Sequence, residues 1–173
     1  FILRRLKQDV AKELPPKTEQ TLYCEMFDRQ KRLYNSVLEI VRQQIKDRIS
    51  AGGVKGAKIA IFDALLKLRQ ICCDPRLSSL AGTEPPESAK FKLFIETVSG
   101  IVHEGHRVLI FSQFVKMLNL MHNALANENI SYLQLDGSTK NRDAVVAKFQ
   151  QSDAYPVFLI SLKAGGTGIN LTA

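Results

Sequence analysis

Apolar residues recur at three- and four-residue spacing in the first half of the chain. After Asp28, an expected N-cap, the stripe consists of Leu33, Val37, Leu38, Val41, Ile45 and Ile49. This spacing predicts an amphipathic helix. Ser50-Ala51-Gly52-Gly53 should end it, and Gly56 should lengthen a flexible basic link. A second helix is predicted from Lys58 to Cys73, where Asp74-Pro75 stops it, so two helices joined by a loop are expected.

The residues on either side of this helical region have the composition of connections. Leu14-Pro15-Pro16-Lys17 breaks any helix, and the alternation from Thr18 to Met26 suits an extended or strand-like segment. Residues 1–27 are therefore predicted to be a connector, with a start that looks cut from a longer chain. Ser78 to Pro86 is rich in Ser, Gly, Pro and Glu, as a loop or domain boundary should be. We expect a helical region over residues 28–86 and a second domain over residues 87–173.

The pattern then changes to helices that alternate with short apolar runs. Arg107 to Phe111 is a continuous apolar run, which is typical of a strand buried on both faces. The other predicted elements are a helix from Ser88 to Glu104 stopped by Gly105, a helix over Val115–Asn127, a strand over Ser131–Leu135, a helix capped by Thr139 and ending at Gln150, and a strand over Val157–Ser161. This order predicts an α/β fold with an incomplete parallel sheet.

Composition excludes several classes of protein. The chain is 45% hydrophobic and 24% charged, as in globular proteins, and no apolar run approaches the ~20 residues of a membrane-spanning helix. Cys24, Cys72 and Cys73 show no CxxC spacing, which argues against a disulfide framework and a zinc site and favours a reducing compartment. Cys72 and Cys73 lie in an apolar stripe and are expected in the core. His103 and His106 straddle a predicted helix end, and no metal role is expected for them.

The net charge of +7 permits a polyanionic partner. Residues 1–89 hold 16 Lys and Arg against 11 Asp and Glu, a net +5, and residues 90–173 hold 8 against 6, a net +2. We interpret the excess as spread over the chain, so that a solvated basic surface is the expectation until a motif locates phosphates.

Small polar residues follow each predicted strand. They are Ser112-Gln113, Asp136-Gly137-Ser138-Thr139 and the segment from Lys163 to Gly168. In open parallel sheets the ligand crevice lies at the carboxyl ends of the strands. Hydroxyl, amide and backbone N–H donors there, with a helix N-terminus at Thr139, suit phosphate oxygens. Any one segment alone is explained as a chain turn, but three together favour a phosphate-tracking edge.

No nucleotide fingerprint is complete. Gly165-Gly166-Thr167-Gly168 does not satisfy the Walker pattern GxxxxGK[ST], and a third glycine for dinucleotide binding is missing. No acidic pair follows a strand as a Walker B site would. This segment is therefore expected to be catalytically silent by itself.

Several segments, in order, resemble Swi/Snf-type helicase-like ATPases of superfamily two. Phe1 to Val10 with Leu14 to Glu19 resembles their inter-lobe segment, and Leu65 to Pro75 resembles their second-lobe entry helix. Arg107 to Phe114, Leu135 to Thr139 and Phe158 to Ala173 are similar to motif IV, the next conserved block and motif V. The resemblance implies part of the second RecA-like (P-loop NTPase-like) lobe, over residues 87–173, preceded by a helical protrusion.

The resemblance also implies the roles of individual residues. Gly168 and Asn170 would approach the nucleotide. The DNA backbone would be faced by Ser112, Gln113, Gly137, Ser138, Thr139, Lys163, Gly165, Gly166 and Thr167. Asp74 stands where the family usually has His, and the sequence stops before motif VI, whose arginines act on ATP phosphates. Such arginines are worth roughly 10³ to 10⁵ in rate, so this segment is not expected to hydrolyse ATP alone.

The implied activity is ATP-dependent movement along double-stranded DNA without sequence preference. It would require ATP, Mg²⁺ and the first RecA-like lobe of the complete protein, and it would remodel DNA-bound proteins. Two alternatives stay open: a lobe of an RNA or duplex-unwinding helicase, and a non-enzymatic module that binds nucleic acid or protein. The wording of motifs IV and V resembles the bacterial branch, which predicts a nucleoid-associated cytoplasmic protein, or a nuclear one in a eukaryote.

Overall fold

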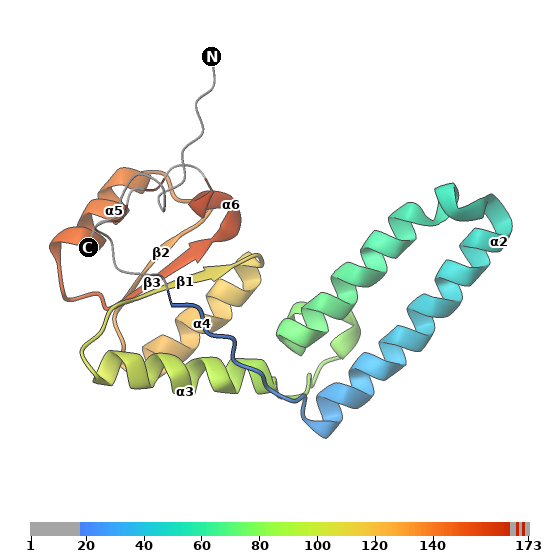
Figure 1. Cartoon of the computed structure of the whole chain (residues 1–173), viewed down its shortest axis with the longest axis horizontal. Helices are drawn as coiled ribbons and strands as arrows, with labels where there is room; N and C mark the ends of the chain where they lie inside the picture. Colours follow the sequence, from blue (N-terminus) through green and yellow to red (C-terminus); the bar gives the residue numbers. More distant parts are fainter. Residues whose placement is uncertain (1–17, 167–168, 170, 172–173) are drawn as a thin grey trace, which may run out of the picture.

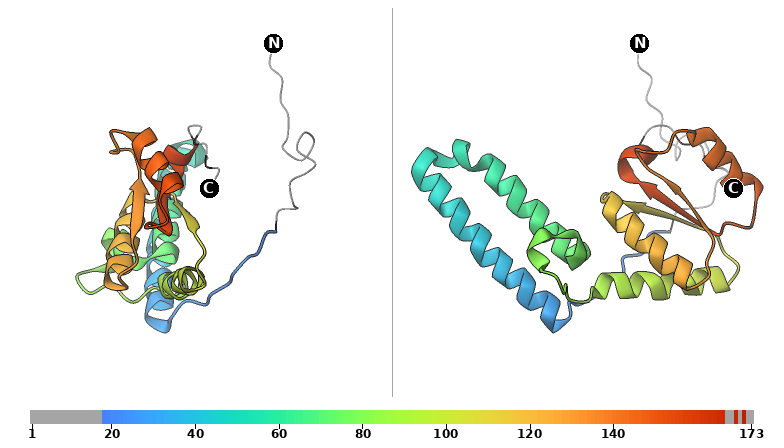
Figure 2. Two further views of the ribbon diagram at one scale, coloured as in Figure 1. Left: turned by 90° about the vertical axis from the view of Figure 1, so that its left-hand side faces the viewer. Right: turned by 180° about the vertical axis from the view of Figure 1, so that it is seen from behind.

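The computed structural model describes residues 18–166, 169 and 171, which form a helical hairpin followed by an α/β unit (Figure 1). The predicted connector is described only from Thr18 onwards, so Leu14 to Lys17 lie outside the described residues. Thr18 to Phe27 run as an extended segment that joins no sheet. Figure 2 shows from two further sides that the hairpin projects away from the sheet.

The hairpin is formed by α2 (Asp28–Cys73), which reverses its direction at one residue. Gly53 has φ 68° and ψ 179°, a conformation that side chains with a Cβ rarely adopt. The two arms return side by side (Figure 1) and pack through a buried cluster. Its fully buried members are Val37 and Val41 from the first arm and Ala64 and Ile71 from the second.

The predicted pair of helices is confirmed, but the predicted flexible link is wrong. Residues on both sides of Gly53, including Ser50 and Gly56, keep helical structure. A single positive φ turns the chain back completely, so no further residues are needed for the reversal. Both arms of the hairpin therefore keep helical structure up to the turn at Gly53.

The α/β unit contains three parallel strands with intervening helices, as predicted. The strands are β1 (Val108–Ser112), β2 (Tyr132–Leu135) and β3 (Val157–Ser161), in the order β1-β3-β2. The helices are α3 (Ala89–His103), α4 (Val115–Asn127), α5 (Arg142–Gln151) and the short α6 (Leu162–Gly165). Two 3₁₀ turns, η1 (Pro75–Leu77) and η2 (Ser79–Ala81), precede α3.

Helices cover both faces of the central strand. Val157 and Leu159 of β3 pack in one cluster with α3 and α4, whereas Phe158 and Ile160 pack in a second cluster with α5 and α6. All five residues of β3 are buried, as predicted.

Burial of β1 on both faces, however, was predicted wrongly. Leu109 and Phe111 are 38% and 49% exposed, because β1 is an outer strand of the described sheet and the cluster under α5 is built on β2 and β3. Val108 and Ile110, on the other face, pack against the cluster formed with α3 and α4. The apolar run was correct for a strand but did not distinguish an edge from a centre.

Helix caps follow the sequence in one case and not in another. Ser88 caps α3, its hydroxyl accepting a hydrogen bond from Phe91 N at 3.1 Å, as predicted. Thr139 does not cap α5. That role belongs to Asn141, whose side-chain oxygen accepts from Ala144 N at 3.1 Å. The Thr139 hydroxyl instead accepts from Asp136 N at 3.0 Å, which places the helix N-terminus further along the chain.

One buried side chain joins the hairpin to the α/β unit. Gln30, 1% exposed, donates from Nε2 to Ile71 O at 2.9 Å and accepts at Oε1 from Ala89 N at 3.1 Å. Ile71 O belongs to the last turn of α2 and Ala89 N to the first turn of α3, where helices leave backbone groups without intrahelical partners. Gln30 therefore satisfies both helix ends and fixes them to the start of α2.

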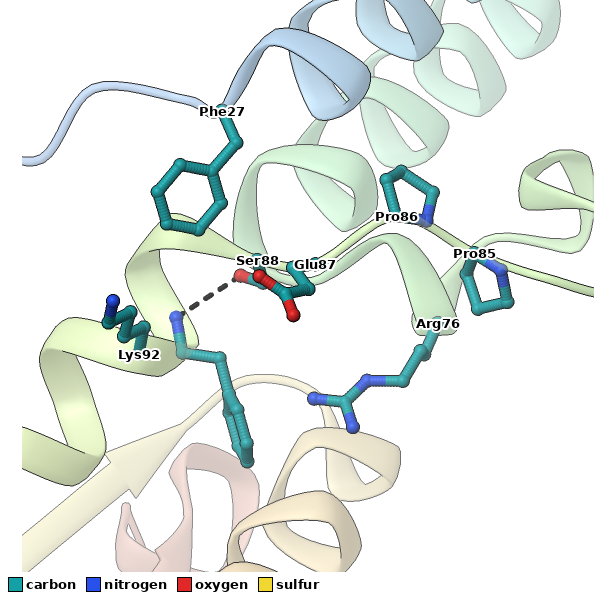
Figure 3. Close-up of a pocket in the computed structure, with 8 residues that line it drawn as sticks. Phe27, Arg76, Pro85, Pro86, Glu87, Ser88 and Lys92 are labelled. Atoms are coloured by element: carbon teal, nitrogen blue, oxygen red, sulfur yellow. Dashed lines mark hydrogen bonds between the residues drawn. The ribbon is translucent and has the colours of Figure 1, made fainter.

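Further contacts surround this joint. The Ser88 hydroxyl donates to Cys73 O at 3.0 Å, and the buried Asp74 carboxylate accepts from the Arg76 side chain at 2.8 and 2.7 Å. Donation of these hydrogen bonds to Asp74 raises the pKa of Arg76. The Arg76 guanidinium also lies 4.5 Å from the centre of the Phe91 ring. A cavity of about 400 Å³ lies beside the joint. Figure 3 shows Arg76 on one side of it and Phe27 and Lys92 on the other.

The cysteines lie near this joint. Cys72 and Cys73 are half-buried at the end of α2, and burial raises the pKa of both thiols, as suits packed rather than reactive groups.

Within residues 18–166, no helix combines the length and hydrophobicity needed to cross a bilayer.

We predict that Gln30→Ala lowers the free energy of unfolding by about 2 to 4 kcal/mol, because two buried backbone groups lose their partners. Urea denaturation of the 173-residue chain measures this. The matched control is Gln44→Ala, at an exposed position of the same helix, which should change stability by less than about 0.5 kcal/mol. Equal stability of the two variants would contradict the role of Gln30.

Candidate nucleic-acid interface

The carboxyl ends of the three strands meet at one edge of the sheet. Ser112 pairs in register with Ser161, and Leu135 pairs with Ile160, so the chain leaves all three strands at nearly the same level. The segments that the sequence singled out are thereby brought together, as expected for parallel strands. We call this the strand-end edge; it comprises Ser112-Gln113, Asp136 to Thr139 and Leu162 to Gly166.

After β1, one side chain shapes the turn and the next points outward. The buried Ser112 hydroxyl accepts from Phe114 N at 3.1 Å and lies 3.2 Å from Phe114 O, so it is engaged within the turn. Gln113 is exposed, and its side-chain oxygen accepts a hydrogen bond from the Arg69 guanidinium. Ser112 positions the segment, whereas Gln113 remains accessible through its amide nitrogen.

Arg69 was missed by the sequence analysis. It lies in α2, 44 residues before Gln113, and no local spacing links the two. The contact places a guanidinium beside the strand-end edge, where it adds positive charge. The second arm of α2 and the end of β1 also line a groove of about 600 Å³ that contains Ser112, Gln113 and Arg69.

After β2, a buried carboxylate organises the loop. Asp136 accepts hydrogen bonds from Ser138 N at 2.8 Å, from Ser138 Oγ at 2.6 Å and from Gln134 Nε2 at 2.8 Å. These bonds lower the pKa of Asp136. Gly137 and Ser138 are exposed and Thr139 is half-buried. The carboxylate thus turns inward, engages both donors of Ser138 and leaves an uncharged exposed surface on the loop, which suits a phosphate neighbour.

Sequence analysis treated Asp136 only as part of a polar segment. An Asp followed two residues later by Ser is a recognisable turn signal, because the carboxylate accepts the later backbone N–H. This signal could have identified Asp136 as the residue that shapes the loop.

After β3, the chain turns at once into the short helix α6. The Ser161 hydroxyl accepts from Ala164 N at 3.2 Å and starts the turn. Lys163 and Gly166 are exposed, and Lys163 has no ion pair with any residue that the structure describes. A Cβ on Gly165 would lie 3.1 Å from the Phe111 ring, so glycine permits the close approach of α6 to β1.

Three predicted site residues, Thr167, Gly168 and Asn170, lie outside the described residues. The strand-end edge therefore combines exposed Gln113, Gly137, Ser138, Lys163 and Gly166 with supporting Ser112, Thr139 and Gly165. The Gln113 amide, the exposed backbone of Gly137 and the Lys163 ammonium group are suited to phosphate oxygens and do not read bases.

We predict that Asp136→Asn reduces the loss of stability in acid. A carboxylate whose pKa is lowered by folding stabilises the protein fully above about pH 4 and loses that contribution as pH falls through the lowered pKa. The variant should be less stable than the wild type at pH 7, and the difference should shrink towards pH 2. Thermal unfolding from pH 7 to 2 measures this, with Asp153→Asn, at an exposed carboxylate, as the control. A constant difference at all pH values would contradict the assignment.

Comparisons with known proteins show which family the chain resembles. A family model described as an SNF2-related domain matches residues 1–77, and one described as the helicase conserved C-terminal domain matches residues 89–173. The ISWI chromatin-remodeling complex ATPase ISW1 of Saccharomyces cerevisiae is 34% identical over 185 residues. That alignment covers 100% of this chain but 16% of the relative, so the chain spans about one sixth of its length.

Solved structures have a similar overall fold. The Sulfolobus solfataricus SWI2/SNF2 ATPase C-terminal domain matches with a TM-score of 0.71 and 33% identity, over 87% of this chain and 66% of that one. The ATPase core of the same organism, in complex with dsDNA, matches with a TM-score of 0.70 and 32% identity, over 93% and 35% of the two chains.

The organisms of these relatives bear on one expectation. They are a yeast and an archaeon, so the preference for a bacterial source finds no support. The family resemblance and the RecA-like fold, in contrast, are confirmed. In motif order, parallel topology and overall structure, the chain belongs to the SNF2 family of helicase-like ATPases.

Proposed function

We propose that this chain supplies the DNA-contacting edge of the second lobe of an ATP-driven double-stranded DNA translocase. The observation that carries the proposal is the strand-end edge. There the carboxyl ends of three parallel strands bring together exposed groups that suit phosphate oxygens. Family membership and the structural match to an ATPase core solved with dsDNA support it. The translocase would move along duplex DNA, which it would bind through the phosphate backbone without sequence preference.

The residues would divide into two roles. Gln113, Gly137, Lys163 and Gly166 are exposed and would lie against phosphates, joined by Thr167 from the part of the chain outside the described residues. Ser112, Ser138, Thr139 and Gly165 would position these residues, because their hydroxyls are engaged within the turns or their small size permits close packing. This refines the sequence prediction, in which all nine faced the DNA directly.

ATP would bind between this lobe and the first RecA-like lobe. Gly168 and Asn170 would approach the nucleotide from this side. Within the described residues, no group of three or more His, Cys, Asp and Glu side chains could hold a metal ion. ATP with Mg²⁺ would supply the energy of movement. This chain would respond by closing on the first lobe with its strand-end edge on the DNA.

The proposal predicts weak, salt-dependent binding of duplex DNA by the 173-residue chain. With about five phosphate contacts, log K should fall with log salt at a slope near −4 to −5. Titration of a mixed-sequence duplex by fluorescence anisotropy at several salt concentrations measures the slope. Lys163→Ala should make the slope less steep by about 1. Sequence-specific binding that does not change with salt would contradict the proposal.

Lys163→Ala is also predicted to lower DNA-stimulated ATP turnover about tenfold, with little effect on turnover without DNA. The reason is that a charged contact to phosphate is lost only in the DNA-bound state. The measurement uses the motor that unites this chain with its first lobe. The control is Lys92→Ala, because Lys92 is an exposed lysine of α3 that does not belong to the strand-end edge. Equal loss of both activities would argue against a DNA-side role for Lys163.

A further inference from the structure

The positive charge of the chain is concentrated in the hairpin. Asp28 to Cys73 contains ten Lys and Arg against four Asp and Glu, a net +6 out of the net +7 of the whole chain. This corrects the interpretation that the excess is spread over the chain. The hairpin lies outside the strand-end edge and has no part in the proposed DNA contacts apart from Arg69.

The second arm of the hairpin carries an apolar stripe that the fold leaves exposed. Ile59, Phe62 and Leu66 are 83%, 71% and 42% exposed. They follow each other at three- and four-residue spacing, which places them on one side of a helix. The arm already buries Ala57, Ala64 and Ile71, of which Ala64 and Ile71 pack against the first arm. The stripe is therefore a second apolar face, not part of the hairpin core.

Spacing of this kind is what a partner helix requires. Apolar side chains at alternating three- and four-residue intervals form the seam along which two helices pack. Contiguous exposed apolar surface on a folded protein generally marks an interaction site. We refer to Ile59, Phe62 and Leu66, with Lys55 and Lys58, as the hairpin stripe.

The charges around the stripe indicate the nature of the partner. Lys55 and Lys58 are exposed, and neither forms an ion pair with any residue between 18 and 166. The nearby Asp63 is held by Lys67, whose Nζ lies 2.6 Å from its carboxylate. A helix that met the stripe would thus face unpaired positive charge, which favours acidic residues beside its own apolar seam.

We propose that the hairpin stripe is a docking surface for an acidic amphipathic helix of a partner protein. Three exposed apolar residues argue for a protein and not for DNA, because a phosphate backbone would use the lysines and leave the apolar side chains in water. Lys55 and Lys58 are both basic, so like-charge repulsion makes a basic partner segment unfavourable. Arg69, one turn beyond Leu66, bonds to Gln113, so a docked helix would lie next to the strand-end edge.

The probe is a fluorescein-labelled helical peptide of three heptads with Leu at positions a and d and Glu at positions e and g. Fluorescence anisotropy with the 173-residue chain should show saturable binding. Phe62→Ala should weaken it about 30-fold, as for a central apolar contact. The double variant Lys55→Glu with Lys58→Glu should weaken it by at least about tenfold. A peptide with Lys in place of Glu should not bind.

Matched controls come from the first arm. Ile40→Ala, at a residue 52% exposed, and Lys31→Glu, at an exposed lysine, should leave binding unchanged. Circular dichroism must show equal helicity and thermal unfolding for all variants, which is expected because the substituted side chains are exposed. Loss of binding in the controls as well would overturn the assignment of the stripe.

Three further results would overturn the proposal. One is the absence of saturable binding of the acidic peptide. Another is binding of duplex DNA that the double variant Lys55→Glu with Lys58→Glu abolishes and Phe62→Ala leaves unchanged, with no such pattern for the peptide. The surface would then bind nucleic acid and not a helix. The third is a concentration-dependent dimer of the chain that Phe62→Ala abolishes, because a second copy would then be the occupant. None of these results bears on the DNA role of Lys163, so the two proposals fail separately.

Discussion

The way in which the hairpin joins the α/β unit depends on the two hydrogen bonds of the buried Gln30 side chain. They join the start of α2 to its own end at Ile71 and to the first turn of α3 at Ala89. Because both backbone groups are buried helix-end groups, replacing the amide leaves them without partners. The joint sets the direction of the hairpin, and through Arg69 it brings a basic side chain to Gln113 at the strand-end edge.

Local signals in the sequence predicted most elements to within a residue or two. Ser88, Gly105 and the apolar run of β3 act through nearest neighbours, so their effects are visible in sequence. The predicted cap of α5 was wrong because two nearby side chains could have taken that role. Thr139 is engaged by Asp136, which leaves the cap of α5 to Asn141.

Contacts between distant residues were beyond sequence reasoning. Gln30 meets partners 41 and 59 residues away, and Arg69 meets Gln113 across 44 residues. The parallel sheet nevertheless brings together the three segments that were selected from strand positions alone. The site was therefore predictable as an edge, whereas the division into donors and positioning residues depends on which hydroxyls the turns engage. The concentration of positive charge could have been counted from the sequence, because the two predicted helices already began at Asp28 and ended at Cys73.

The central claim is that this lobe serves a motor driven along duplex DNA. It is tested most directly by ATP turnover of the motor that unites this chain with its first lobe, measured without nucleic acid and with duplex DNA, single-stranded DNA or RNA, with the 173-residue chain alone as the blank. The account predicts strong stimulation by duplex DNA only. Stimulation by RNA, or no turnover under any condition, would contradict it.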